Sequence, residues 1–157
     1  MAKIGCCFTG HRNLDVCEID GIRQRLRETI IKLIDKGVNV FLAGGALGFD
    51  TIAALEVLEI RKEYPEISLI LVLPCMEQTK GWSEEDRAVY DDIMSRADGH
   101  TYVQESYTKG CMFARNRRLV ELSTYCLCYM REMKGGTAYT VKQAMEKGIE
   151  VINLAIV

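Results

Sequence analysis

The sequence has no long hydrophobic segment and no excess of positive charge, and both absences narrow the functions it can have. No apolar run in its 157 residues approaches the roughly 18 that a membrane-spanning helix needs. The formal net charge is −2, so the chain as a whole has no general electrostatic attraction to nucleic acid or to an anionic membrane. We therefore expect any anion site to be local, and expect neither a membrane nor a nucleic acid as a partner.

The seven cysteines lack the spacing of a metal site. Cys6, Cys7, Cys126 and Cys128 lie in apolar segments that we interpret as buried strands, where cysteine behaves as a small apolar residue. The one-residue gap between Cys126 and Cys128 matches neither a zinc motif nor a thioredoxin-like motif. The odd count and the lack of a secretory signal favour free thiols in a reducing compartment. We expect a cytoplasmic protein with no metal and no required cofactor.

Predicted strands and helices alternate along the chain. Short apolar segments predict strands at residues 3–8, 38–43, 67–73, 100–103, 124–130 and 150–154. Apolar residues three and four positions apart, with suitable end residues, predict helices at 19–36, 51–64, 83–96, 111–123 and 137–147. This alternation favours an α/β fold, in which residues 1–157 form a single Rossmann-like three-layer domain with a mostly parallel sheet. A homo-oligomer is compatible with the apolar content.

Residues typical of element ends support these bounds. Ser83 precedes three acidic residues and is placed as an N-cap. Gly37 and Gly148 are placed as C-terminal caps. The two prolines in the chain, Pro65 and Pro74, follow a predicted helix and a predicted strand.

Three loops that follow predicted strands carry unusual residues. Residues 44–50 read Gly-Gly-Ala-Leu-Gly-Phe-Asp and open onto a helix, where glycines bring backbone N–H groups close to a ligand and the helix dipole favours an anion. Residues 9–12 read Thr-Gly-His-Arg, and residues 134–137 read Lys-Gly-Gly-Thr. Ligands of parallel α/β sheets bind beyond the carboxyl ends of the strands, where the strand order reverses. If the first and fifth long strands are neighbours, all three loops meet in one crevice.

Each polar residue of the first and third loops has a simpler alternative role. Thr9 and Thr137 are candidates either for helix caps or, for Thr137 especially, for contact with a phosphate oxygen. Arg12 is either a solvated charge or a bidentate partner of a phosphate or carboxylate. His11 is either a general acid or base or a residue that hydrogen-bonds the loop. Lys134 is either a cation at the rim or a turn residue.

The remaining candidates lie in the second loop and in the helix at 111–123. Asp50 either caps its helix or accepts hydrogen bonds from ribose hydroxyls. Arg115 and Asn116 are placed to reach the rim of the crevice, whereas Arg117 and Arg118 are interpreted as a solvated face. Trp82, in the loop at 75–83, is expected to cover apolar surface or a ligand.

In this order, the motifs resemble those of the SLOG superfamily, which includes DNA-processing protein A and the "lonely guy" phosphoribohydrolases, and they look most like its YpsA-like branch. The resemblance covers residue 3 to about 154 and implies a Rossmann-like fold whose glycine loops hold a nucleotide-derived ligand. The ligand-binding residues that it predicts together with the loops are Thr9, Gly10, His11, Arg12, Gly44, Gly45, Gly48, Asp50, Arg115, Asn116, Gly135, Gly136 and Thr137.

The sequence departs from the phosphoribohydrolases at the third loop. Those enzymes carry Pro-Gly-Gly-x-Gly-Thr-x-x-Glu, in which the glutamate is catalytic. Residues 134–142 here contain no carboxylate where that glutamate would be, and Lys142 lies nearby. Arg115, which lines up with an active-site arginine of that family, is retained and can serve binding alone.

Three functions remain open from the sequence. The leading interpretation is a binding or sensing module for a nucleotide-derived small molecule, such as ADP-ribose, an NAD-related compound or a nucleoside phosphate. The second is a nucleotide-processing hydrolase or transferase, for which His11, Asp50 and Arg115 are catalytic candidates; Glu56 is a further acid/base candidate, expected to face solvent. The third is single-stranded DNA binding through Arg115, Arg117 and Arg118.

Overall fold

The computed structural model describes residues 2–155, which form one parallel sheet covered by helices on both faces. The strands are β1 (Gly5–Gly10), β2 (Val40–Ala43), β3 (Ser68–Leu73), β4 (Gly99–Tyr102), β5 (Tyr125–Tyr129) and β6 (Glu150–Asn153). They are arranged in the order β4-β3-β2-β1-β5-β6, and every neighbouring pair is parallel. The predicted Rossmann-like α/β fold is confirmed.

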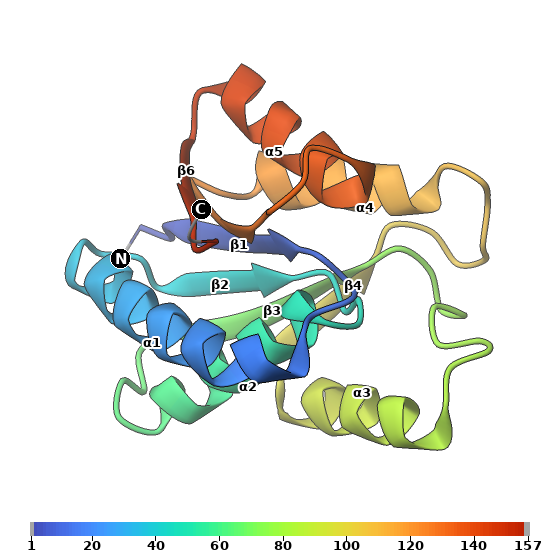
Figure 1. The fold of residues 1–157 in the computed structure, drawn as a ribbon, viewed down its shortest axis with the longest axis horizontal. Coiled ribbons are helices and arrows are strands. Elements are labelled where there is room, and N and C mark those ends of the chain that lie inside the picture. The colour runs from blue at the N-terminus through green and yellow to red at the C-terminus, as the bar shows by residue number, and fades with distance from the viewer. Residues whose placement is uncertain (1, 156–157) are drawn as a thin grey trace.

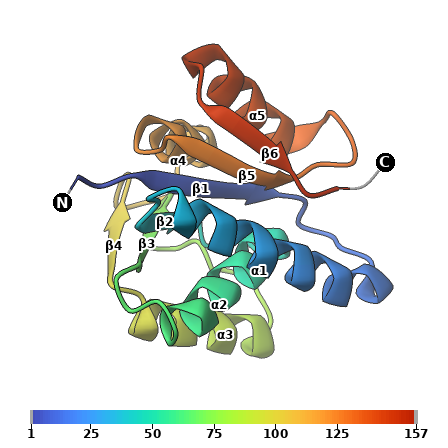
Figure 2. The same cartoon turned by 90° about the vertical axis from the view of Figure 1, so that its left-hand side faces the viewer.

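Helices cover the two faces unequally, as Figures 1 and 2 show from two directions. The helices α1 (Ile19–Asp35), α2 (Phe49–Arg61) and α3 (Glu84–Arg96) lie on one face. The helices α4 (Cys111–Glu121) and α5 (Gly135–Lys147) lie on the other. A single turn of 3₁₀ helix, η1 (Val16–Glu18), precedes α1. None of the described helices is long and apolar enough to cross a membrane.

The core is divided by the sheet, because side chains alternate between its faces along each strand. Along β1, Phe8 packs in the larger cluster beneath α1 and α2, whereas Cys7 packs in the smaller cluster beneath α4 and α5. Cys126 and Cys128 of β5 join Cys7 in the smaller cluster. These thiols are buried and free, as predicted for residues that act as small apolar side chains.

The strand order places the three predicted loops at one edge of the sheet. The chain adds β2, β3 and β4 on one side of β1 and then returns to add β5 and β6 on the other. β1 pairs with β5 through Gly10↔Tyr129 at their carboxyl ends. The condition under which the three loops meet is thus fulfilled, and the strand order reverses beside the loops.

The structure corrects the predicted bounds near the loops. β1 continues through Thr9 and Gly10 instead of ending at Phe8, because both residues pair with β5. A polar threonine and a glycine suggested a turn, but a Cβ at position 10 would lie 2.4 Å from the Phe49 ring. Glycine is needed there because α2 packs against the strand, and α2 itself begins at Phe49 instead of Thr51.

The predicted helix ends are largely confirmed. The Ser83 side chain accepts a hydrogen bond from the backbone N–H of Asp86 at 3.1 Å and caps α3. Gly148 ends α5 with φ 83°, and Gly37 follows α1 with φ 102°. Both values lie in the left-handed region that glycine adopts without strain.

Candidate functional site

A cavity of about 510 Å³ opens at the carboxyl ends of β1, β2 and β5. It draws residues from all three predicted loops and from α4. Of the predicted ligand-binding residues, those that line it are Thr9, Gly10, His11, Arg12, Asp50, Arg115, Asn116, Gly135, Gly136 and Thr137. The sequence therefore located the cavity, whereas the ligand contacts of these residues stay predictions.

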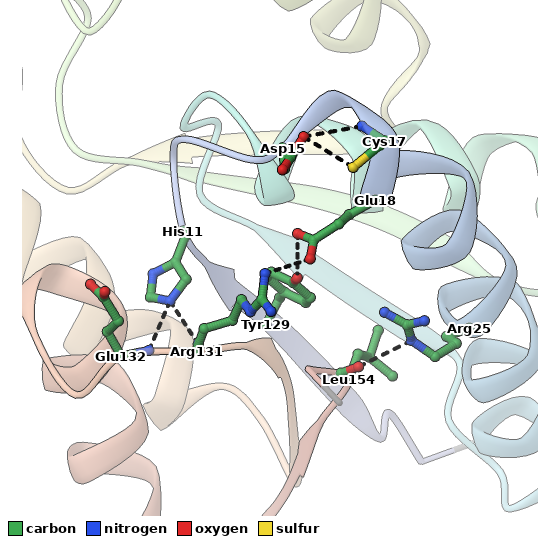
Figure 3. A network of polar contacts seen from close by, with 9 residues as sticks. All are labelled: His11, Asp15, Cys17, Glu18, Arg25, Tyr129, Arg131, Glu132 and Leu154. Carbon is green, nitrogen blue, oxygen red and sulfur yellow. Dashed lines mark hydrogen bonds and ion pairs between the residues drawn. The ribbon is translucent and has the colours of Figure 1, made fainter. Parts of the chain in front are cut away.

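The first loop is joined to the third by His11 (Figure 3). Its Nε2 accepts hydrogen bonds from the backbone N–H groups of Arg131 at 2.8 Å and of Glu132 at 3.3 Å. An imidazole nitrogen that accepts two such bonds carries no proton, so Nδ1 holds the proton of the neutral ring. Of the two roles that the sequence left open for His11, this geometry favours the one that holds the loop.

Glu18 strengthens the same junction from the start of α1. Its carboxylate accepts hydrogen bonds from the Tyr129 hydroxyl at 3.0 Å and from the Arg131 guanidinium. The backbone N–H of His11 also donates to the carbonyl oxygen of Tyr129 at 3.2 Å. The first and third loops thus form one connected wall of the cavity.

The glycines of the second loop lie behind the cavity and let other groups approach. A Cβ at Gly44 would lie 2.6 Å from the Arg115 guanidinium. A Cβ at Gly48 would lie 2.2 Å from the carbonyl oxygen of Arg12, and the φ of Gly48 is +80°. Gly45, with φ +73°, borders a separate cavity of about 70 Å³. None of the three is among the residues that line the larger cavity, so their predicted contact with a ligand stays a prediction.

Asp50 lies in the first turn of α2 and is the carboxylate of the cavity. The residue is 6% exposed, and its carboxylate accepts a hydrogen bond from the backbone N–H of Ala46 at 3.4 Å. Burial raises the pKa of Asp50 to about 6, although the positive charge of Arg115 and the backbone hydrogen bonds favour the ionised form. A carboxyl group in this state can be either protonated or ionised near neutral pH.

Arg115 places a buried positive charge at the back of the cavity. The residue is 6% exposed, and its guanidinium donates hydrogen bonds to the carbonyl oxygen of Gly44 and, at 2.7 Å, to Oδ1 of Asn116. Burial lowers the pKa of Arg115, while the neighbouring Asp50 opposes that shift. Within residues 2–155, no carboxylate oxygen lies within 4 Å of the guanidinium. A buried guanidinium without a close counter-ion is a strong attractor for an anion.

The third loop directs the N-terminus of α5 at the same cavity. Gly135 has φ +76°, and a Cβ there would contact nothing within 4 Å among the described atoms. Lys134, the N-cap of α5, makes no side-chain hydrogen bond to the first turn. The first N–H groups of a helix lack intrahelical acceptors, and the residues of the first turn of α5, Gly135, Gly136 and the buried Thr137, line the cavity. Lys134 lines the rim and pairs with Glu132 at 2.8 Å.

Gln78 and Met112 also line the cavity, although the sequence did not indicate either of them as a ligand-binding residue. Gln78 is buried, and its Nε2 donates to the carbonyl oxygen of Gly44 at 3.1 Å. Met112 lies one turn before Arg115 on α4. The sequence could have indicated Gln78 only through its position, because the loop that contains it follows β3 and so begins at the same edge of the sheet.

Other candidates lie away from the cavity. Glu56 was expected to face solvent, and this prediction is wrong. The residue is 7% exposed and pairs with Arg23 of α1 at 2.8 Å. Its place on the inner side of α2, facing α1, is the physical reason, and this position removes it from the site. Arg117 donates to the Tyr139 hydroxyl at 2.9 Å, and Arg118 pairs with Glu121 at 3.3 Å. Both arginines are exposed, as the solvated-face interpretation predicted.

The cavity contains no cluster of metal ligands among the residues that the structure describes. Across them, no group of three or more histidine, cysteine, aspartate or glutamate side chains could hold a metal ion. The cavity therefore presents one carboxyl group, that of Asp50, against three cationic side chains, those of Arg12, Arg115 and Lys134. Its other polar side chains are those of Thr9, His11, Gln78, Asn116 and Thr137. This set of donors suits an anionic ligand.

Comparisons with known proteins agree with this architecture. The family model for YpsA, described as the YspA SLOG family, matches residues 6–155. UPF0398 proteins of Bacillus thuringiensis (strain Al Hakam) and Bacillus cereus (strain Q1) are each 32% identical over 133 residues, which cover 83% of this chain and 72% of theirs.

Two solved structures share the fold. DNA processing protein A from Streptococcus pneumoniae has a TM-score of 0.70 and 19% identity, and the alignment covers 96% of this chain but 50% of that one. The Helicobacter pylori protein of the same name, whose structure is described in terms of a unique single-stranded DNA binding mode, has a TM-score of 0.70 and 23% identity. There the coverage is 96% of this chain and 64% of the other. At these identities the likeness shows the fold alone.

Proposed function

The chain belongs to the YspA SLOG family, and from that premise we propose that it is a binding or sensing module for a nucleotide-derived ligand. The phosphate of the ligand occupies the cavity at the carboxyl ends of β1 and β5. Arg115 and the N-terminus of α5 bind the phosphate oxygens, with Thr137 as a further donor. Arg12 and Lys134 lie at the rim and attract the same charge.

The observation that carries this proposal is the buried Arg115 guanidinium at the back of an open cavity. Taking a guanidinium out of water costs several kcal/mol unless an anion compensates for it. Asp50 supplies only part of that compensation, because no carboxylate oxygen of residues 2–155 lies within 4 Å of the guanidinium. A phosphate that bridges Arg115 and the uncapped turn of α5 would complete the charge balance.

A thermal-shift panel tests the proposal. AMP, ADP-ribose and NAD are compared with adenosine, which has the same base and ribose but no phosphate. A ligand that binds only the folded protein raises the melting temperature according to its concentration relative to Kd. We expect stabilisation by at least one phosphate-bearing compound and none by adenosine. If no compound of the panel raises the melting temperature at millimolar concentration, the proposal is wrong.

Asp50 supports a second candidate function, in which the bound nucleotide is hydrolysed or transferred. A carboxyl group with a pKa of about 6 in a cavity can exchange a proton near the working pH, as a general acid or base does. Mass spectrometry of AMP and ADP-ribose after incubation with the protein separates the two functions. A binder returns both compounds unchanged, whereas an enzyme produces new masses that disappear in the Asp50→Asn variant.

Single-stranded DNA is the third candidate, supported by the description of the Helicobacter pylori protein. One phosphate of a strand would occupy the same cavity. The net charge of −2 gives the chain no general attraction to DNA, and Arg118, one of the arginines of the predicted DNA contact, pairs with Glu121. DNA binding that uses several phosphates weakens steeply as salt rises. A titration with a labelled oligonucleotide at two salt concentrations measures this slope, and a flat or absent response excludes the DNA function.

A further inference from the structure

A second compartment of about 470 Å³ adjoins the cavity. The two spaces share four lining residues, Arg12, Gln78, Trp82 and Met112. Because these residues border both spaces, the two compartments are adjacent. A ligand anchored by its phosphate at Arg115 would reach the second space by passing Trp82.

The second compartment has two aromatic residues in its wall, beside charged and polar ones. Trp82 and Tyr107 both line it, with Met112 beside them. Tyr107 is 61% exposed, which is a large aromatic surface to leave in water. Flat, apolar side chains of this kind suit the face of a heterocycle, because every nucleobase presents a π-face that stacks on them.

The Trp82 ring is held in place before any ligand arrives. It packs edge-to-face against Tyr90 of α3, with 5.6 Å between ring centroids. The backbone N–H of Trp82 donates to the carbonyl oxygen of Thr79 at 3.0 Å, which closes the turn that carries the residue. A stacking surface that is already ordered loses little conformational entropy on binding.

Arg12 links the two compartments. Its guanidinium carbon lies 5.8 Å from the centroid of the Trp82 ring, at cation–π distance, and the side chain is exposed. The same residue lines the phosphate cavity. A guanidinium that turns from Trp82 to a phosphate oxygen exchanges a weak exposed cation–π contact for a charge-assisted hydrogen bond. That movement uncovers the ring face for a base.

We propose that the second compartment is a nucleobase subsite, in which the base of a nucleotide stacks on Trp82 while its phosphate is held at Arg115 and the N-terminus of α5. This inference rests on the proposed function and adds the requirement for a base. Glu77 and Lys80 line the compartment and offer an acceptor and a donor to the edge of the base. The ligand class is then an intact nucleotide, not a sugar phosphate.

The test compares AMP with ribose 5-phosphate, which has the sugar and the phosphate but no base. Trp82 is the single tryptophan of the chain, so tryptophan fluorescence reports on the surroundings of this one ring, and calorimetry gives the two affinities. We expect AMP to bind at least about tenfold more tightly than ribose 5-phosphate, the range that stacking of one base on an aromatic side chain provides. We also expect AMP to quench the fluorescence more than ribose 5-phosphate does.

Variants assign the difference to the subsite. In Trp82→Leu the ratio of the two affinities should fall to near one, and in Tyr107→Leu it should fall partway. Phe113→Leu is the matched control, because Phe113 is an aromatic residue with 44% exposure on α4 that lines neither compartment. Its affinity ratio should equal that of the wild type.

The outcomes separate the subsite from the function on which it rests. If both compounds bind with equal affinity, the base subsite is wrong and phosphate binding stands. If neither compound binds, phosphate binding is wrong and the subsite falls with it. A tenfold preference for AMP that survives Trp82→Leu also overturns the assignment, because the base would then be bound elsewhere.

Discussion

The Arg115 guanidinium donates a hydrogen bond to the carbonyl oxygen of Gly44, a residue 71 positions earlier in the chain. This bond joins α4 to the loop that follows β2. It also explains why position 44 is glycine, because a Cβ there would lie 2.6 Å from Nη1 and 2.9 Å from the guanidinium carbon of Arg115. The second loop is therefore shaped around a buried cation.

Replacing Gly44 with alanine should displace Arg115. The added methyl group occupies the place of the guanidinium, so we expect the affinity for AMP to fall about tenfold or more, as when one charge-assisted hydrogen bond is lost. Calorimetry measures the affinity for AMP. Gly21→Ala on α1 is the control, because a Cβ there contacts only Arg25 at 3.4 Å; its affinity should be unchanged. An unchanged affinity in Gly44→Ala would mean that Arg115 does not need its present position.

Gly48 should matter more for the stability of the fold than for ligand binding. Its φ is +80°, and a Cβ would lie 2.2 Å from the carbonyl oxygen of Arg12 and 2.7 Å from that of His11. Gly48→Ala combines left-handed strain with a backbone clash, so we expect the free energy of unfolding to fall by about 2–4 kcal/mol. Chemical denaturation measures this loss. A loss below about 1 kcal/mol would show that the first loop moves aside easily.

Gly135 and Gly148 form a matched pair at the two ends of α5. Both have positive φ, +76° and +83°, and a Cβ at either would meet nothing within 4 Å in the described part of the chain. Alanine at either position should lower the free energy of unfolding by about 1–2 kcal/mol through backbone strain alone. Only Gly135 lines the cavity, so only Gly135→Ala should also weaken the binding of AMP. Equal affinities in the two variants would argue against phosphate binding at α5.

Asp50 should make stability depend on pH. Its pKa is about 6 in the folded protein and near 3.8 when exposed. The folded state therefore holds the proton more tightly, and this contribution is complete below about pH 4 and is lost as the pH rises through about 6. The shift corresponds to about 3 kcal/mol. In the wild type the free energy of unfolding should therefore decrease between pH 4 and 7. In Asp50→Asn, which keeps an oxygen for the N–H of Ala46, this decrease should be absent. Parallel pH profiles for the two proteins would contradict the buried-carboxyl assignment.

The sequence predicted the sheet, the helices and the meeting of the three loops. Apolar strands such as β3 and caps such as Ser83 are local signals that need no knowledge of distant contacts. The meeting of the three loops was predicted on the condition that the first and fifth strands are neighbours, and the strand order meets that condition. The cavity followed from them because its position is set by the ends of the strands.

The roles of individual residues were harder to predict from the sequence, because they depend on contacts between distant segments. Nothing near Gly44 in the sequence shows that Arg115 packs on it. Glu56 resembled an exposed helix residue because its partner, Arg23, lies on another helix. The hydrogen bonds of His11 to residues 131 and 132 likewise require the three-dimensional fold.

The affinity of the Arg115→Lys variant for AMP, measured by calorimetry, tests the central claim most directly. Lysine keeps the positive charge but cannot donate to Gly44, Asn116 and a phosphate in one plane. Arg117→Lys is the matched control on the same helix, since Arg117 is exposed and contacts the Tyr139 hydroxyl. We predict at least about tenfold weaker binding in Arg115→Lys and wild-type binding in Arg117→Lys. Wild-type affinity in Arg115→Lys, or equal losses in both variants, would contradict the account.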